Sequence, residues 1–262
     1  MRFSIFFALF VVLLTGCATE QGCTDPNAVN FDQEAIEDDG SCEYGQGAGD
    51  GCSSVEMDGY SYGVVEIGNQ CWFSENLRTT VFADGSLIPG YLPAADWENT
   101  MEAAFATYGA GSSPCNEEPC DEVIALAEFG RLYNFAAAID SRNICPTGWA
   151  VSTRADWEQL MDYLEANGNE SVSGDVLKSS SGWIQDGNGA DLYGFDGRGA
   201  GWRGAASGSF NSARWVTYFH TGEVQGDSTL RPRLYATDDL LKMDWGAVGN
   251  GNLGISVRCV KD

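Results

Sequence analysis

The chain has 262 residues, of which 38 are Asp or Glu and 14 are Lys or Arg, so its formal net charge at pH 7 is −24. A field this negative repels nucleic acid and anionic lipid headgroups, and we therefore expect neither as a partner. The same charge favours solubility in water and the binding of divalent cations.

The first residues have the layout of a bacterial secretory signal. Arg2 is followed by an apolar run from Phe3 to Leu14, which is shorter than the roughly 20 residues needed to cross a hydrocarbon core. The LTGC tetrapeptide that follows resembles a lipobox, in which the cysteine carries lipid and becomes the N-terminus. We expect a signal peptide over residues 1–16, lipid on Cys17, and a surface-exposed position in the cell envelope, anchored in the outer membrane. The alternatives are a signal peptide cut elsewhere or a buried strand.

Nine cysteines occur in the chain, and setting Cys17 aside leaves an even set of eight. An exported chain is expected to oxidise such a set to disulfides, although spacing alone does not determine which cysteines pair. The spacing and the segment boundaries suggest four bridges: Cys23–Cys42, Cys52–Cys71, Cys115–Cys120 and Cys145–Cys259. A zinc site is the competing interpretation, but the sequence has no CxxC pair and no Cys/His cluster.

Residues 22–45 form an acidic segment with few large aliphatic side chains, too few to fold by hydrophobic burial alone. The segment resembles a GCTDPxAxN…DDGSC cassette of exported bacterial proteins, which implies a small module held by one disulfide. Calcium is the only cofactor that the sequence suggests, with oxygen ligands from five residues: Asp25, Asn27, Asp32, Asp38 and Asp39. A solvated acidic spacer is the alternative, and both interpretations stay open. A glycine-rich linker completes residues 17–51 and separates the cassette from a domain over residues 52–262.

Local patterns in the domain predict an α+β fold that is rich in loops. The segment Tyr62–Phe73 predicts two strands joined by a tight turn near Gly68. The clearest helix is predicted over residues 153–168, where Thr153 and Asp156 make a capping box and Gly168 ends the helix. Its apolar face has four members: Trp157, Leu160, Met161 and Leu164. A shorter helix is predicted over Phe135–Ile139.

Six segments, in one order, resemble the Fibrobacter succinogenes major paralogous domain (FISUMP). They are VEIGNQCWFSENLRT at 65–79, GRLYNFAAA at 130–138, CPTGWAVSTRADWEQL at 145–160, LKSSSGW at 177–183, DLYGFDGRGAGWR at 191–203 and GISVRCVKD at 254–262. That family is similar to the C-type-lectin-like superfamily. The resemblance implies a C-type-lectin-like fold in which Val64–Phe73 and Ile255–Val260 pair, with the Cys145–Cys259 bridge fastening the second of these strands.

The same superfamily contains copper-dependent formylglycine-generating enzymes and iron-dependent sulfoxide synthases. The copper enzymes need two free thiolates and the iron enzymes need a histidine cluster. This chain has a single histidine, His220, for which we expect a structural role, and its cysteines form an even set. We therefore expect no catalytic activity, and an oxidoreductase of the formylglycine-generating kind is the less favoured alternative.

A binding role is better supported by the aromatic and arginine residues between positions 183 and 235. Aromatic rings and guanidinium groups together can stack on sugars and bond their hydroxyls. The segment 214–222 departs from the family pattern where lectin-like folds vary their ligand surface, which makes it the favoured site. The candidate ligand residues are Trp215, Tyr218, Arg203, Arg214 and Arg231, whereas Trp183 and Trp202 are expected in the core. We expect a glycan or a cell-surface protein as ligand, in adhesion or substrate capture; a structural surface component without a small ligand is the alternative.

Overall fold

The computed structural model describes residues 21–22, 35–38, 41, 52–111, 119, 121–247 and 251–262. The chain divides into two compact units, residues 1–48 and 49–262. In the first unit, β1 (Gln21–Gly22) pairs in parallel with β2 (Glu37–Asp38). No helix in the described ranges is long and apolar enough to cross a membrane.

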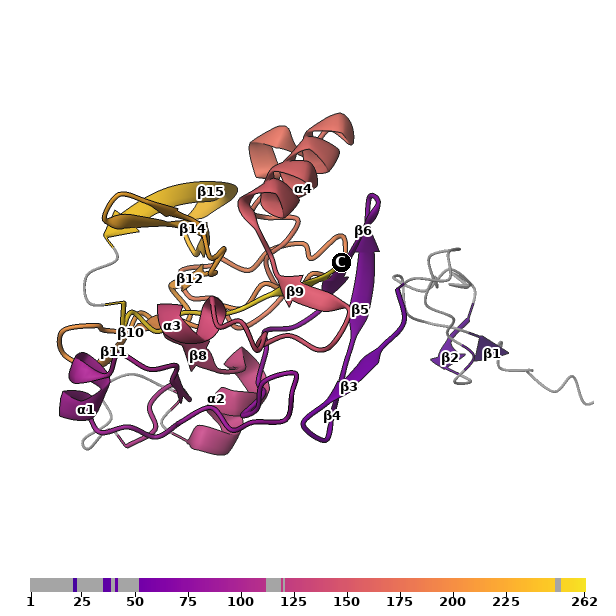
Figure 1. Cartoon of the computed structure of the whole chain (residues 1–262). Coiled ribbons are helices and arrows are strands. Elements are labelled where there is room, and N and C mark those ends of the chain that lie inside the picture. The colour runs from indigo at the N-terminus through magenta and orange to yellow at the C-terminus, as the bar shows by residue number, and fades with distance from the viewer. Residues whose placement is uncertain are drawn as a thin grey trace, which may run out of the picture. The chain divides into compact units, whose positions relative to one another are not determined.

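The second unit is built around a four-stranded sheet that joins the two ends of the domain (Figure 1). Its order is β5 (Val64–Ile67), β6 (Gln70–Phe73), β16 (Cys259–Lys261) and β9 (Trp149–Val151). Gly68, with a φ of 66°, makes the turn between β5 and β6 in the left-handed region that glycine tolerates best. Trp72 on β6 lies opposite Val260 on β16, so the expected pairing of the first and last parts of the domain is confirmed. A hairpin of β3 (Val55–Met57) and β4 (Tyr60–Tyr62) precedes this sheet.

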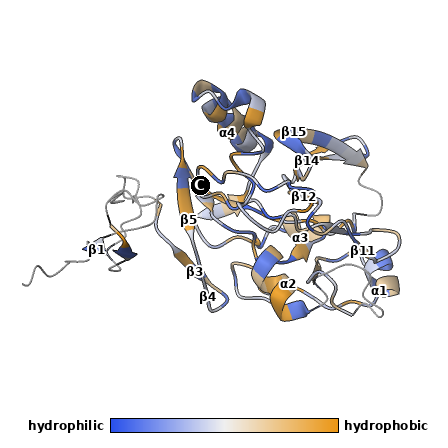
Figure 2. Ribbon diagram, turned by 180° about the vertical axis from the view of Figure 1, so that it is seen from behind, coloured by the Kyte–Doolittle hydropathy of each residue, from blue (hydrophilic) through white to orange (hydrophobic). Residues whose placement is uncertain are grey.

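The helix predicted from the Thr153 capping box is α4 (Arg154–Ala166). The Thr153 hydroxyl accepts the Asp156 N–H while the Asp156 carboxylate accepts the Thr153 N–H, which satisfies two N–H groups at the helix start. Trp157, Leu160 and Leu164 are fully buried, and the blue and orange residues alternating along α4 in Figure 2 show its amphipathic character. The remaining helices are short: α1 (Ala94–Asn99), α2 (Glu122–Phe129), α3 (Phe135–Ala138) and the 3₁₀ turn η1 (Glu170–Val172).

A second sheet is formed by the chain between α4 and β16. Strand β14 (Ser228–Tyr235) pairs with β12 (Val216–Tyr218), β13 (Val224–Gln225) and the long β15 (Asp238–Ala247). Two small ribbons complete the fold: β7 (Phe105–Ala106) with β8 (Leu132–Tyr133), and β10 (Trp202–Arg203) with β11 (Phe210–Asn211). This mixture of short strands, short helices and long connections is the α+β arrangement expected from the sequence.

Two disulfides lie in the described part of the chain, Cys52–Cys71 and Cys145–Cys259, and both are among the bridges that the spacing suggested. The second links the loop before β9 to β16. Trp183 is buried with the aromatic cluster around Trp72 and Trp157, and Trp202 is partly buried. The core therefore takes up much of the aromatic content of the domain.

Candidate functional site

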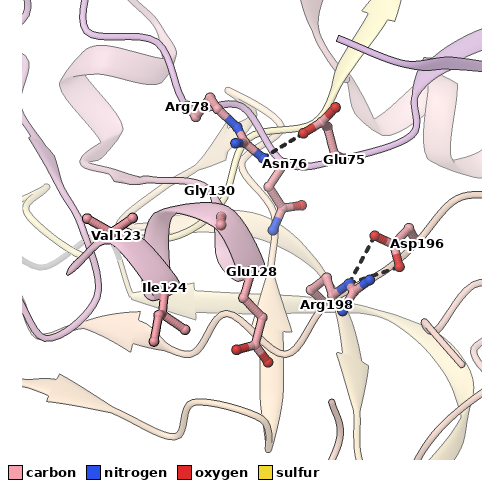
Figure 3. A pocket seen from close by; sticks show the side chains of 10 residues that line it. Glu75, Asn76, Arg78, Val123, Ile124, Glu128, Gly130, Asp196 and Arg198 are labelled. Atoms are coloured by element: carbon pink, nitrogen blue, oxygen red, sulfur yellow. Dashed lines mark hydrogen bonds and ion pairs between the residues drawn. The ribbon is translucent and has the colours of Figure 1, made fainter. Parts of the chain in front are cut away.

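A cavity of about 430 Å³ is lined by α2 and by two loops (Figure 3). One loop directly follows β6, and the other lies in the connection between η1 and β10. One wall is the segment after β6, with Glu75, Asn76 and Arg78. A second wall is α2, with Val123, Ile124, Ala127 and Glu128, ending at Gly130. The third is the turn that carries Asp196 and Arg198. We call this cavity the paired-charge pocket.

Backbone hydrogen bonds fix each wall. The Leu77 N–H donates to the Val257 carbonyl, and the Leu77 carbonyl accepts the Arg131 N–H, both at 3.0 Å. Asp121 caps the start of helix α2, where its carboxylate accepts the N–H groups of Val123 and Ile124. The lining side chains therefore project from ordered backbone.

The charged side chains of the pocket are neutralised in pairs. Arg78 Nη2 donates to Glu75 Oε2 at 2.7 Å, and Arg198 Nε donates to both carboxylate oxygens of Asp196 at 2.9 Å. Glu128 is held by a residue behind the lining, Arg214, whose Nε and Nη2 donate to its two oxygens at 3.2 and 2.9 Å. Glu128 and Arg78 keep only 16% and 17% of their side-chain surface exposed. The pocket thus offers hydrogen-bond donors and acceptors with nearly balanced charge.

The back of the pocket is organised by a fully buried arginine. Arg258 Nη2 donates to Asn76 Oδ1 at 2.9 Å, and Nη1 donates to the Phe73 and Phe195 carbonyls at 2.8 and 2.5 Å. Asn76 in turn donates to the Phe129 carbonyl at the end of α2, at 3.0 Å. Burial lowers the pKa of Arg258 to about 10, so the group stays a cation at neutral pH. One guanidinium and one amide therefore tie all three walls together.

Asp191 supports the third wall. Its Oδ1 accepts the Asp196 N–H at 2.8 Å, and burial raises its pKa to about 6. Asp191 itself adopts the left-handed conformation, with a φ of 46°.

The ligand residues predicted from the sequence do not line this pocket. Trp215 is half-buried and packs against the core, with its ring 6.4 Å from that of Tyr235, and Tyr218 is a half-buried residue of β12. Arg214 does not line the pocket, but it holds the lining residue Glu128 by two hydrogen bonds. Arg231 braces the second sheet, since its Nε donates to Thr229 Oγ1 at 2.9 Å and its Nη2 to the Ala247 carbonyl at 2.6 Å.

Arg203, another of the predicted ligand residues, lies inside the fold. Its side chain is buried, with 4% of the residue exposed, and its Nη2 donates to the Leu92 carbonyl at 2.7 Å. The guanidinium also stacks over Trp97 at 4.3 Å. Desolvation lowers the pKa of Arg203 to about 10. These contacts hold the guanidinium of Arg203 within the fold, and its role as a ligand residue stays a prediction.

His220 has the structural surroundings expected for it. The residue is 3% exposed, and its Nε2–H donates to the Tyr133 carbonyl at 2.8 Å. Burial lowers its pKa to about 4, so the ring is neutral at pH 7. Within the described ranges, no three His, Cys, Asp or Glu residues gather in a way that would hold a metal ion.

Several predictions fall on parts of the chain outside the described residues. These are Cys17, Cys23, Cys42, Cys115, Cys120, Asp25, Asn27, Asp32 and Asp39, together with the side chain of Asp38. Lipidation, the two remaining disulfides and the calcium site stay predictions.

Sequence reasoning missed the lining residues because the three walls of the pocket come from segments that are distant along the chain. One signal was present. Glu75, Asn76 and Arg78 belong to the first of the six FISUMP-like segments, Gly130 opens the second, and Asp196 and Arg198 lie in the fifth. The charged and amide residues within these family-like segments are the feature that could have pointed to the pocket.

Comparison with known proteins identifies the family. Residues 65–261 match the model of the Fibrobacter succinogenes major domain, a range that includes every lining residue of the paired-charge pocket. No curated protein and no solved structure matches the chain. The matched range covers most of the 262 residues, and the chain therefore belongs to the Fibrobacter succinogenes major domain family.

Proposed function

We propose that this chain is an exported surface lipoprotein whose domain is a non-catalytic, lectin-like binding module, with the paired-charge pocket as the site for a glycan. The observation that carries the proposal is that each acidic side chain lining the cavity is paired with a guanidinium: Glu75 with Arg78, Asp196 with Arg198, and Glu128 with Arg214 from behind the lining.

Paired charges suit hydroxyl groups better than they suit ions. A sugar hydroxyl donates to a carboxylate oxygen and accepts from a guanidinium N–H, and neighbouring hydroxyls can use both members of one pair. An ionic ligand gains less, because each charge already has a partner. In the described part of the chain the Nη groups of Arg198 make no hydrogen bond, which leaves donors for a ligand.

The apolar side of the pocket matches the other face of a sugar ring. Val123 and Ile124 on α2 are 77% and 54% exposed at the rim, and Ala127 lines the wall beside them. Covering such side chains with the C–H face of a sugar removes apolar surface from water. The cavity volume of about 430 Å³ falls within the usual range of about 300–1,000 Å³ for small-molecule sites and suits one or two sugar units.

The chemistry of the remaining groups favours binding over catalysis. The single histidine is buried and bonded to a backbone carbonyl, and Cys145 and Cys259 are joined to each other. Neither is free to serve as a general base, a metal ligand or a nucleophile. The lipobox-like LTGC sequence supports attachment to a membrane, where two or more acyl chains give stable anchoring.

The test is a glycan-array screen followed by calorimetry, using the protein from residue 18 onward. Arg198→Ala removes one charge-assisted donor and is expected to weaken binding at least about tenfold. Arg142→Ala is the matched control, since Arg142 forms a similar pair with Asp140 at 2.7 Å outside the pocket. Absence of any glycan ligand, or equal binding by both variants, would contradict the proposal. Loss of glycan binding in Trp215→Ala but not in Arg198→Ala would instead place the binding site at the start of β12.

A further inference from the structure

Strand β15 lies at the outer edge of the second sheet, where Figure 1 shows it beyond β14. It pairs with β14 along one side over Asp238–Ala247. In an antiparallel strand the N–H and C=O of one residue point to the same side, and successive residues alternate between the two sides. Every second residue of β15 therefore directs its backbone groups away from β14.

The first half of this outer edge is covered. The Asp239 carbonyl accepts the N–H groups of Gly174 and Asp175 at 2.7 and 3.1 Å. The Leu241 N–H donates to Ser173 Oγ at 3.1 Å. The turn after η1 thus bonds the Asp239 carbonyl and the Leu241 N–H and covers this part of the edge.

The second half is open. Met243 lies opposite Pro232 of β14. Pro232 has no N–H, and its carbonyl accepts the Phe219 N–H on the side of β14 away from β15, so Pro232 makes no ladder bond to Met243. Met243 therefore points outward, and Trp245 and Ala247 follow the same alternation. In the described ranges the backbone groups of Met243 and Trp245 have no partner on this edge, whereas the Ala247 carbonyl accepts Arg231 Nη2. The Trp245 side chain is 40% exposed.

We propose that residues 243–247 of β15 pair, antiparallel, with the same residues of a second copy of this chain. The pairing is two-fold symmetric and centred on Trp245. Trp245 then bonds to its counterpart through both backbone groups, and each Met243 meets the Ala247 of the other copy. All of these are outward-pointing residues, so the register satisfies the open edge.

The side chains are self-complementary in this register. The two Trp245 rings lie on the same face directly opposite each other, a cross-strand arrangement that stabilises antiparallel pairs. Asp244 lies opposite Gly246, so no like charges meet. Asp244 is already paired with Arg233 at 2.9 Å, which leaves the segment locally neutral in a strongly acidic chain.

Symmetry and charge set two further expectations. A two-fold contact through one edge closes after two copies and does not propagate into fibres. Because the whole chain carries a net charge of −24, two copies repel each other at long range, and added salt screens that repulsion. The dimer should therefore strengthen, not weaken, as ionic strength rises.

Sedimentation equilibrium of the chain from residue 18 onward tests the proposal, at concentrations from about 10 μM to about 1 mM, since an edge contact of this size is expected to be weak. Trp245→Lys removes the ring, and Ala247→Pro removes an outward N–H without touching the β14 ladder. Each is expected to raise the dissociation constant at least about tenfold. Leu240→Lys is the control, because Leu240 is exposed on the covered half of β15 and its change should leave dimerisation intact.

Hydrogen exchange supplies a readout that needs no variant. The amides of Met243 and Trp245 should become protected as protein concentration rises, while the Leu241 amide, bonded to Ser173, should not change. A chain that stays monomeric at about 1 mM in high salt, species larger than dimers, or variants that dimerise like the wild type would each overturn the proposal. Near-ultraviolet circular dichroism identifies any variant that has failed to fold.

Discussion

The two disulfides in the described part of the domain should contribute unequally to its stability, because they close loops of very different length. Cys145 and Cys259 are 114 residues apart, and Cys52 and Cys71 are 19 apart. In the chain-entropy description, a crosslink restricts the unfolded chain by an amount that grows with the logarithm of the loop length. These separations give about 5 kcal/mol for the longer loop and about 3 kcal/mol for the shorter one.

Urea unfolding of the two paired Cys→Ala variants measures the difference directly. Removing Cys145–Cys259 is expected to lower the free energy of unfolding by about 1.5 kcal/mol more than removing Cys52–Cys71, and the burial of Cys145 and Cys259 adds a cavity term of the same sign. The urea m-value should rise in the longer-loop variant, since its unfolded chain expands further. An equal or larger loss on removing Cys52–Cys71, with unchanged m-values, would refute the loop-length reasoning.

Three further changes test the buried polar groups and the helix cap. The pKa of His220 is about 4 in the fold against 6.5 ordinarily, so as pH falls the unfolded chain binds this proton first. The free energy of unfolding therefore falls by about 3 kcal/mol as pH drops from 6.5 to 4. Urea unfolding at these two pH values should show that His220→Gln lacks this contribution. Arg258→Met should destabilise the fold by roughly 3–5 kcal/mol in thermal unfolding, because it leaves acceptors such as Asn76 Oδ1 and the Phe195 carbonyl without a donor. Thr153→Ala should lose about 1 kcal/mol of unfolding free energy in urea and Thr153→Ser much less; equal losses would argue against the capping hydrogen bond.

The sequence predicted the elements whose signals are local. The hairpin around Gly68 and the capped helix α4 each depend on a few neighbouring residues, and the structure has both. The second sheet gave no such signal. Its central strand, β14, carries Pro232, which usually argues against a central strand. The fold accommodates this proline because the residue opposite, Met243, needs no hydrogen-bond donor from β14.

The site was less predictable than the fold because arginine next to aromatic residues has two common uses. At a surface the pair can bind a ligand, and in a core it forms an internal cation–π contact. Arg203 over Trp97 at 4.3 Å and Arg258 over Phe195 at 4.2 Å are both of the internal kind. Only burial separates the two uses, and burial depends on contacts between distant segments, 63 residues apart for Arg258 and Phe195 and 111 for Arg203 and Leu92, which a local pattern does not reveal.

The same strand that closes the domain also organises its pocket. Arg258 directly precedes Cys259, so the guanidinium behind the pocket is held beside the disulfide to Cys145 and the β6–β16 pairing. Because Arg258 reaches the Phe195 carbonyl and Asn76, the pocket walls cannot separate without breaking contacts of the core. A ligand entering the pocket would therefore find its donors and acceptors already fixed and would spend little free energy on ordering them. Under the proposed function, the affinity of this charge-balanced cavity for a neutral ligand would come from that preorganisation.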